Sequence, residues 1–185
     1  MARLIFGAVF LSFLLLNALQ ERGLKRRGLD TAGARPVDRR LFALGKLSTL
    51  LCWLAAALQA SGVDIRMTAV PPRAELLAAA LFLGGFGVLA AAYHDLGDAN
   101  RTGLPSDATR LRTSGVYSWS RNPLYLGLYL MTAGAVLYSG CPVAALLGAA
   151  AVFAHHRIAL AEEAFLAGRF GEEYERYRRR VGRYL

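Results

Sequence analysis

The stretch LFALGKLSTLLCWLAAALQA, residues 41–60, decides the fold class of this chain of 185 residues. Lys46 is its single charged residue. An α-helix rises about 1.5 Å per residue, so a helix over this stretch is about 30 Å long, which is the thickness of the hydrocarbon layer of a bilayer. The stretch therefore predicts a membrane-spanning helix.

Four further apolar blocks flank this stretch, and 55% of all residues are hydrophobic. They are Leu4–Leu19, Ala74–Tyr93, Pro123–Tyr138 and Pro142–Ala154. The second of these also matches the hydrocarbon layer, whereas the other three are short and require local thinning of the bilayer. For the last two blocks, buried helices of a soluble core are the alternative. We predict an all-α, polytopic membrane protein with about five transmembrane helices and a C-terminal cytoplasmic helical segment.

Basic residues are unevenly distributed between the blocks. Eighteen of the 22 Lys and Arg residues fall in segments 21–40, 94–121 and 157–185, on one side of a five-helix chain. Cytoplasmic loops carry such an excess, so the N-terminus is predicted outside and the C-terminus inside. A cleaved signal peptide is the alternative for the first block, but the basic cluster behind it favours an uncleaved helix.

The charge and composition also bear on partners and location. The net charge of +9 lies beside apolar blocks, which indicates membrane lipids with anionic headgroups as partners, and no nucleic acid. Arg outnumbers Lys twenty to two, a bias that suggests a bacterial inner membrane. No repeat or long low-complexity linker is visible, so we expect one domain over residues 1–185. Three helices occupy 1–93, and a polar loop, a helical hairpin and C-terminal helices occupy 94–185.

The polar loop between His94 and Pro123 is longer than a connection needs to be, so it is either disordered or functional. Its regular glycines and the aromatic residues Tyr117 and Trp119 favour an ordered loop. The block before it carries small residues at helical spacing, which predict close packing against a neighbouring helix. These small residues are Ala80, Gly84, Gly87 and Ala91.

Arg121 and Asn122 stand at the threshold of the fourth block, in the sequence SRNPLYLGLYL, residues 120–130. Pro123 is a good first residue of a helix and biases Asn122 away from the helical region. Free backbone N–H groups at a helix N-terminus, with a cation beside them, form a place to hold an anion. A basic anchor at the membrane surface is the alternative for Arg121, and this stretch alone does not decide between them.

Arg157, Glu162 and Glu163 continue the fifth block as a helix beyond the membrane. None of the three faces a residue of opposite charge one helical turn away, so all three require partners from other parts of the chain. Adjacent helical positions lie about 100° apart, so we expect one carboxylate to face inward and the other outward. The inward carboxylate can pair with Arg121, either as a structural ion pair or within a functional site.

The C-terminal residues predict a helix of another kind. Glu172 with Arg176, and Glu175 with Arg179, are acid-before-base pairs at i,i+4. A stripe of apolar and aromatic side chains runs along the same segment, so we expect this helix to lie against the protein or the cytoplasmic interface. The stripe consists of Tyr174, Tyr177 and Val181.

Several chemistries lack the residues they need. His94, His155 and His156 are too few for a membrane di-iron centre, and we predict no metal site. Cys52 and Cys141 fall at different depths of the predicted bundle, so no disulfide is expected. The sequence contains neither a G-x-S-x-G elbow nor a G-x-G-x-x-G or Walker loop.

Two segments together resemble the isoprenylcysteine carboxyl methyltransferase family and the related phospholipid methyltransferases. They are GVYSWSRNPLYLG, residues 115–127, and RIALAEEAFLAGRFGEEYERYRRRV, residues 157–181. The family pattern is G-x-Y-x-x-x-R-[HN]-P-x-Y-x-G, a helical hairpin, then E-E-x-x-L, F-G and Y-x-x-Y-x-x-x-V. The matching positions are Gly115, Tyr117, Arg121, Pro123, Tyr125, Gly127, Glu162, Glu163, Leu166, Phe170, Gly171, Tyr174, Tyr177 and Val181.

The sequence departs from the family pattern at two places. Asn122 stands where the eukaryotic prenylcysteine enzymes have His, which excludes proton transfer at this position because an amide does not titrate. The stretch VGRYL, residues 181–185, lacks the proline often found there, which leaves the docking of these residues open.

The resemblance implies an integral membrane methyltransferase that uses S-adenosylmethionine and a lipophilic acceptor, such as a prenylcysteine-type carboxylate or a phospholipid amine. Arg121 would hold the cofactor's carboxylate, a glutamate would accept from its amine or ribose, and tyrosines would line the site. The alternatives are an NADPH-dependent sterol-type membrane reductase, which has a similar Arg-x-Pro-x-Tyr stretch, and a non-enzymatic membrane adaptor. The implied catalytic residues are Arg121, Arg157, Glu162 and Glu163, and the implied cofactor-binding residues are Gly115, Tyr117, Arg121, Asn122, Tyr125, Glu162, Glu163 and Tyr174.

Overall fold

The computed structural model describes residues 1–28, 35–97 and 110–185. Over these ranges the chain is helical and contains no β-strand, so the predicted all-α membrane fold is confirmed. The elements are α1 (Ala2–Arg26), α2 (Arg39–Ser61), α3 (Pro72–Leu96), the 3₁₀ turn η2 (Gly115–Ser118), α4 (Pro123–Ser139), α5 (Pro142–Phe170) and α6 (Glu172–Arg180). The prediction of an ordered loop after His94 falls largely on residues 98–109, which lie outside the described residues.

Four helices of the described chain are long and apolar enough to cross a membrane, namely α1, α2, α3 and α5. The apolar helix α4 has 17 residues and is about 26 Å long, in agreement with the predicted short fourth block. Helix α5 has 29 residues and continues past its apolar block, so Glu162 and Glu163 lie on the same helix as Pro142.

The helix boundaries follow from local sequence. The carboxylate of Asp38 accepts hydrogen bonds from the backbone N–H groups of Arg40 and Leu41 and caps the start of α2. Helices α3, α4 and α5 each begin with a proline, whose fixed φ suits the first helical turn. Gly140 ends α4 in the left-handed conformation, with a φ of 55°, and allows the tight turn into α5.

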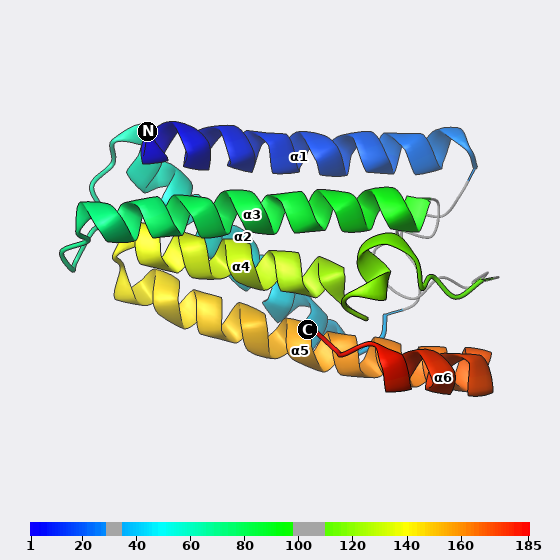
Figure 1. Ribbon diagram of the computed structural model, residues 1–185. Helices are drawn as coiled ribbons and strands as arrows, with labels where there is room; N and C mark the ends of the chain where they lie inside the picture. The colour runs from blue at the N-terminus through cyan, green and yellow to red at the C-terminus, as the bar shows by residue number, and fades with distance from the viewer. Residues whose placement is uncertain (29–34, 98–109) are drawn as a thin grey trace.

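Helices α1, α3, α4 and α5 run side by side, and α2 lies behind them (Figure 1). Helix α4 packs mainly against α3, and α5 packs mainly against α2. The ends of α1, α3 and α5 and the starts of α2 and α4 meet at one end of the bundle (Figure 1). This is the end at which the five-helix chain places the basic segments; its assignment to the cytoplasm stays a prediction.

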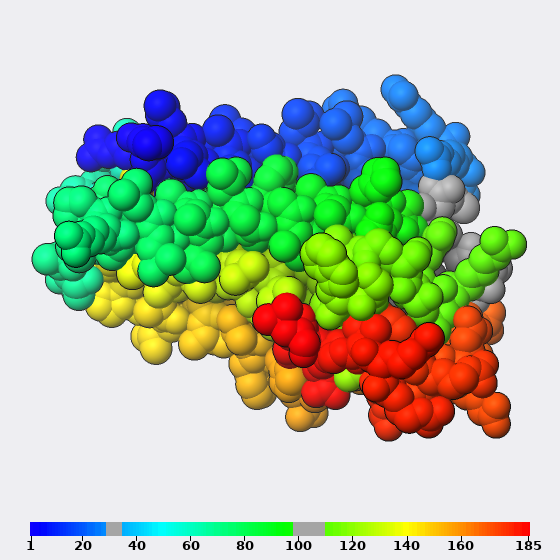
Figure 2. Space-filling view, viewed as in Figure 1, coloured from blue at the N-terminus to red at the C-terminus, as the bar shows by residue number. Residues whose placement is uncertain are grey.

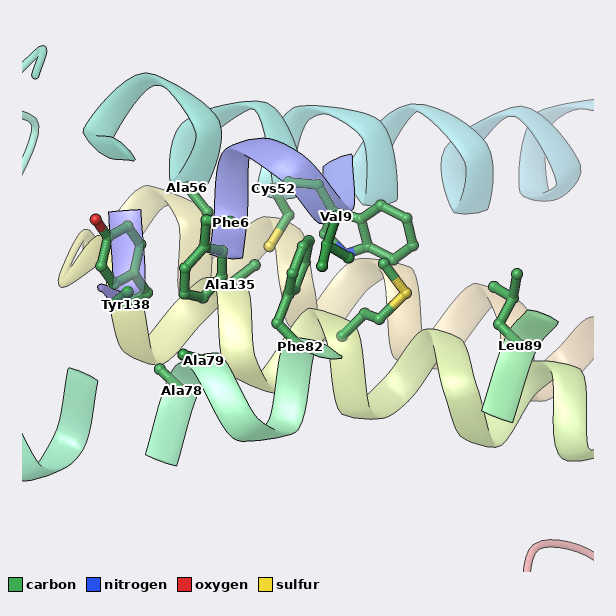
Figure 3. Close-up of a cluster of buried hydrophobic side chains, with 13 residues drawn as sticks. Phe6, Val9, Cys52, Ala56, Ala78, Ala79, Phe82, Leu89, Ala135 and Tyr138 are labelled. Atoms are coloured by element: carbon green, nitrogen blue, oxygen red, sulfur yellow. The ribbon is translucent and has the colours of Figure 1, made fainter. Parts of the chain in front are cut away.

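Buried hydrophobic side chains from α1, α2, α3 and α4 form one cluster (Figure 3). The rings of Phe6 and Tyr138 stack with their centroids 4.1 Å apart, and Trp53 meets Phe82 edge-on. The indole N–H of Trp53 donates to the hydroxyl of Thr132 at 3.1 Å. These contacts join α1, α2, α3 and α4, so the bundle is held together far from the start of α4.

Helices α3 and α4 approach each other closely at glycines. A Cβ atom at Gly85 would lie 2.7 Å from the carbonyl oxygen of Gly127, and one at Gly134 would lie 2.6 Å from the carbonyl oxygen of Ala78. The predicted small-residue contact on α3 thus exists, but the predicted face is wrong. Gly84 and Gly87 have no neighbouring atom within 4 Å, because the interface follows positions seven apart, Ala78, Gly85 and Ala92.

Helix α6 packs through the predicted aromatic stripe, since Tyr174 and Tyr177 are both buried. The ion pair of Glu172 with Arg176 is present at 3.6 Å. The predicted partner of Glu175 is wrong: its carboxylate pairs with Arg178 at 3.2 Å, because position i+3 is as close as i+4 on a helix.

Candidate active site

A sharp turn leads the chain into α4. Gly115 starts η2 with a φ of 62°, a conformation that favours glycine, and a Cβ atom there would collide with the carboxylate of Asp95. That carboxylate accepts a hydrogen bond from the backbone N–H of Val116 at 2.8 Å. Asp95 therefore fixes this turn to the end of α3, and the turn positions Tyr117 and Arg121.

The side chains of Arg121 and Glu163 meet inside the protein. Arg121 directly precedes the cap of α4, and Glu163 lies on the extension of α5. The Arg121 Nη1 atom and the Glu163 Oε2 atom are 3.6 Å apart, and both side chains are less than a tenth exposed. The predicted pairing of Arg121 with an inward glutamate is thus present, at a distance longer than a hydrogen bond.

Glu163 has closer partners than Arg121. Its Oε1 atom accepts hydrogen bonds from Asn122 Nδ2 at 2.7 Å and from Arg183 Nε at 3.1 Å. Its Oε2 atom accepts from Arg183 Nη2 at 3.2 Å. The carboxylate is therefore held at two points by the guanidinium of Arg183 and at a third by the amide of Asn122.

Arg121 keeps buried donors without partners among the described residues. Its Nε and Nη1 atoms are inaccessible to solvent and have no acceptor within hydrogen-bond geometry, and the hydroxyl group of Tyr174, which lies beside this guanidinium, likewise has no hydrogen-bond partner. Burial raises the pKa of Tyr174 to about 12, so this hydroxyl stays protonated. Buried donors without acceptors are costly, so a group of this kind is suited to an anion that satisfies them.

The charges of this cluster agree with an anion site. Arg121 and Arg183 contribute two positive charges and Glu163 contributes one negative charge, within contacts of 3.6 Å or less. The cluster therefore carries one net positive charge; the side chains of Arg121 and Glu163 are buried, and that of Arg183 is partly exposed. A single carboxylate would neutralise it and would supply acceptors to the unpaired donors.

Glu162 has a separate environment from Glu163. Its Oε1 atom accepts a hydrogen bond of 2.8 Å from the hydroxyl group of Tyr125, which is buried on α4. The expectation that one carboxylate faces inward and the other outward is wrong, because Glu162 contacts Tyr125 and Glu163 contacts Asn122, and both partners lie at the start of α4. Tyr117 is also buried, and burial together with the nearby charge of Glu162 raises the pKa of Tyr117.

Helix α6 ties this region to the C-terminal residues. The hydroxyl group of Tyr177 donates a hydrogen bond of 2.6 Å to the carbonyl oxygen of Tyr117. In Figure 2 the C-terminal residues, in red, lie against the light-green segment that precedes α4. The docking of the last residues, which the sequence left open, is present for residues 182–184, whereas Leu185 is exposed.

The structure separates one predicted residue from the others. Arg157 lies on the exposed face of α5, six residues before Glu163, and has no ion-pair partner among the described residues. Arg183 and Asp95 contact the site although neither belongs to the motif residues predicted from the sequence. In the sequence, Asp95 could have been recognised by its position at the end of the third apolar block. Arg183 could have been recognised only because it lies two residues after Val181, which matches the family pattern.

A sequence model of the family described as "Phospholipid methyltransferase" matches residues 74–173, which is more than half of the chain. The match begins in α3, includes η2, α4 and α5, and reaches the first residues of α6.

Three curated proteins show a similarity over a shorter stretch, and each is named "Protein-S-isoprenylcysteine O-methyltransferase". The protein of Mus musculus is 38% identical over 77 residues, which is 41% of this chain and 27% of that protein. The protein of Homo sapiens gives the same identity and coverage. The protein of Schizosaccharomyces pombe is 37% identical over 73 residues, or 38% of this chain and 30% of that protein. The similarity thus spans less than a third of the length of each relative.

Proposed function

Since the chain belongs to the phospholipid methyltransferase family, we propose that it is an integral membrane methyltransferase that transfers a methyl group from S-adenosylmethionine to a lipophilic acceptor. The observation that carries this proposal is the buried guanidinium of Arg121, which retains donors without acceptors. It lies beside the carboxylate of Glu163, both of whose oxygens already accept hydrogen bonds from other residues. Both residues lie in the segment that the family model matches.

The residues of the site fit the polar groups of S-adenosylmethionine. Its carboxylate would accept hydrogen bonds from Arg121 and from the hydroxyl group of Tyr174, the buried donors that lack acceptors. Its amine and its ribose hydroxyl groups require acceptors, which Glu162 would supply. We assign this contact to Glu162 because both oxygens of Glu163 are already occupied by Asn122 and Arg183.

The aromatic residues around Glu162 suit a cation. Tyr117 and Tyr125 are both buried, and aromatic faces attract positive charge. When bound, S-adenosylmethionine supplies an electrophilic methyl group on a positively charged sulfonium. The role of the chain is to hold and orient this group and to exclude water from it, which is what methyl transfer chiefly requires.

The acceptors that are open to this site differ in whether they must lose a proton. Burial raises the pKa of Tyr117 and of Tyr174, so both hydroxyl groups remain protonated near neutral pH and do not act as bases. Asn122 does not titrate. A carboxylate acceptor reacts without loss of a proton, whereas an ammonium or thiol group must lose one. The printed names of the relatives support a carboxylate on a prenylcysteine-type molecule over a phospholipid amine.

The acceptor is proposed to reach the site from the bilayer. Large apolar side chains are exposed along α1, α2 and α3, as expected of helices in contact with lipid. We propose further that the basic end of the bundle, and with it the site, faces the cytoplasm of a bacterial cell. Incubation of membranes with an isotopically labelled methyl donor, followed by mass spectrometry of lipids and prenylated peptides, would identify the acceptor.

Titration calorimetry of the purified chain in detergent tests the cofactor assignment. The wild-type protein is expected to bind S-adenosylhomocysteine and not NADP, whereas binding of NADP alone would favour the reductase. Arg121→Ala is expected to lose at least tenfold in affinity, since a hydrogen bond to a charged group is worth about 1.5–3 kcal/mol. Arg121→Lys keeps the charge and loses the planar donor pair, so its affinity should be intermediate. Unchanged affinity in Arg121→Ala would contradict the assignment.

A further inference from the structure

The residues after α6 return to the start of α4 and are fixed there by backbone hydrogen bonds. The backbone N–H of Arg121 donates to the carbonyl oxygen of Gly182 at 3.0 Å, and that of Asn122 donates to the carbonyl oxygen of Arg183 at 3.1 Å. The hydroxyl group of Ser120 donates to the same Arg183 oxygen at 3.1 Å. The tail segment, residues 182–184, thus binds to the same turn that positions the Arg121 side chain.

A second anchor lies one residue further along. The hydroxyl group of Tyr184 is 2.8 Å from His156 Nδ1 on α5 and 3.1 Å from the hydroxyl group of Tyr129 on α4. The rings of Tyr129 and Tyr184 meet edge-on, with centroids 5.3 Å apart. Arg183 is therefore held between two anchored neighbours, with its side chain on Glu163.

This arrangement decides which guanidinium Glu163 binds. Arg183 contacts both carboxylate oxygens, at 3.1 and 3.2 Å, whereas Arg121 remains at 3.6 Å and makes no hydrogen bond to them. A shift of well under 1 Å would convert the Arg121 contact into a hydrogen bond. A buried carboxylate without Arg183 would therefore be expected to take up Arg121, because unpaired buried charges are costly.

We propose that Arg183 is a positioning residue of the methyltransferase site: by binding both oxygens of Glu163, it keeps Arg121 free for the anionic group of the cofactor. The inference rests on the proposed function, because it assigns Arg121 to the carboxylate of S-adenosylmethionine. With Arg183 in place the cluster has one net positive charge and an unsatisfied guanidinium. Without Arg183, Glu163 would neutralise Arg121, and the cofactor would have to compete for it.

The test measures S-adenosylhomocysteine binding by titration calorimetry on the full chain in detergent. Arg183→Gln is expected to raise the dissociation constant about tenfold or more. Replacing Glu163 as well, in the double variant Glu163→Gln with Arg183→Gln, should restore most of the affinity, because a neutral amide no longer takes up Arg121. The control is Arg179→Gln, which removes the same charge from an exposed position on α6 and should bind as the wild type does.

The outcomes separate this inference from the proposed function. If the wild-type protein does not bind S-adenosylhomocysteine, the proposed function fails and the inference fails with it. If the wild type binds and Arg183→Gln binds equally well, only the inference is overturned. A double variant that is no better than Arg183→Gln would show that Arg183 merely supports the fold. Should Arg183→Gln not fold, Arg183→Met makes the same test, since it keeps a long side chain and removes both hydrogen bonds to Glu163; unchanged affinity would again overturn the inference.

Discussion

Replacing Gly85 by Ala is expected to force α3 and α4 apart. The added Cβ atom would lie 2.7 Å from the carbonyl oxygen of Gly127 and 2.7 Å from the backbone nitrogen of Met131. Relief to an ordinary separation of about 3.5 Å requires a shift of roughly 0.8 Å between two helix backbones. Such overpacking costs about 1–3 kcal/mol of the free energy of unfolding.

The neighbouring residue Gly84 is a matched control in the same helix. A Cβ atom there meets no atom within 4 Å, so Gly84→Ala retains only the gain in helix propensity, about 0.5–1 kcal/mol. Both substitutions share this gain, so the difference between the two variants isolates the packing cost. A difference of about 2 kcal/mol corresponds to roughly 4–8 °C in the unfolding midpoint of a chain of this size.

Thermal unfolding of both variants in one detergent measures this difference. Gly85→Ala should unfold at the lower temperature, and Gly84→Ala should equal or exceed the wild type. Gly85→Ala should also weaken S-adenosylhomocysteine binding, because α4 carries Tyr125 and its cap directly follows Arg121. Equal midpoints for the two variants, or a lower midpoint for Gly84→Ala, would refute the close packing of α3 on α4.

Two further predictions concern the site and the topology. Tyr125→Phe removes the 2.8 Å hydrogen bond to the carboxylate of Glu162 and should cost about 1.5–3 kcal/mol of stability in thermal unfolding. Tyr129→Phe, one turn along α4, removes a hydrogen bond between hydroxyl groups and should cost about 1 kcal/mol; an equal or larger loss there would contradict this ranking. Single cysteines introduced at Arg110 and Val63 should react with impermeant reagents from the cytoplasmic and the outer side, respectively, and the reverse labelling pattern would invert the proposed orientation.

Much of the fold could be predicted from composition and local signals. Runs of apolar residues must form helices in a bilayer, because backbone groups in lipid have to be satisfied within the segment. The backbone preferences of single residues determine the helix starts at Pro123 and Pro142 and the turn at Gly140. These features do not require tertiary contacts. The uneven distribution of Arg and Lys can likewise be read from the sequence. Because the basic segments follow the first, third and fifth apolar blocks, they come to lie at one end of the bundle.

The tertiary structure decided which of several equivalent residues is used. Gly84 and Gly85 have the same local propensities, and only the position of α4 makes the second a contact and the first a free surface. Glu162 and Glu163 are adjacent and chemically identical, and their different partners, Tyr125 for one and Asn122 with Arg183 for the other, come from segments distant in sequence. Local sequence determines helices because their hydrogen bonds join residues four apart. The contact of Arg183 with Glu163 instead joins residues twenty apart, one after α6 and the other on α5. Only the packed bundle brings their side chains within 3.2 Å.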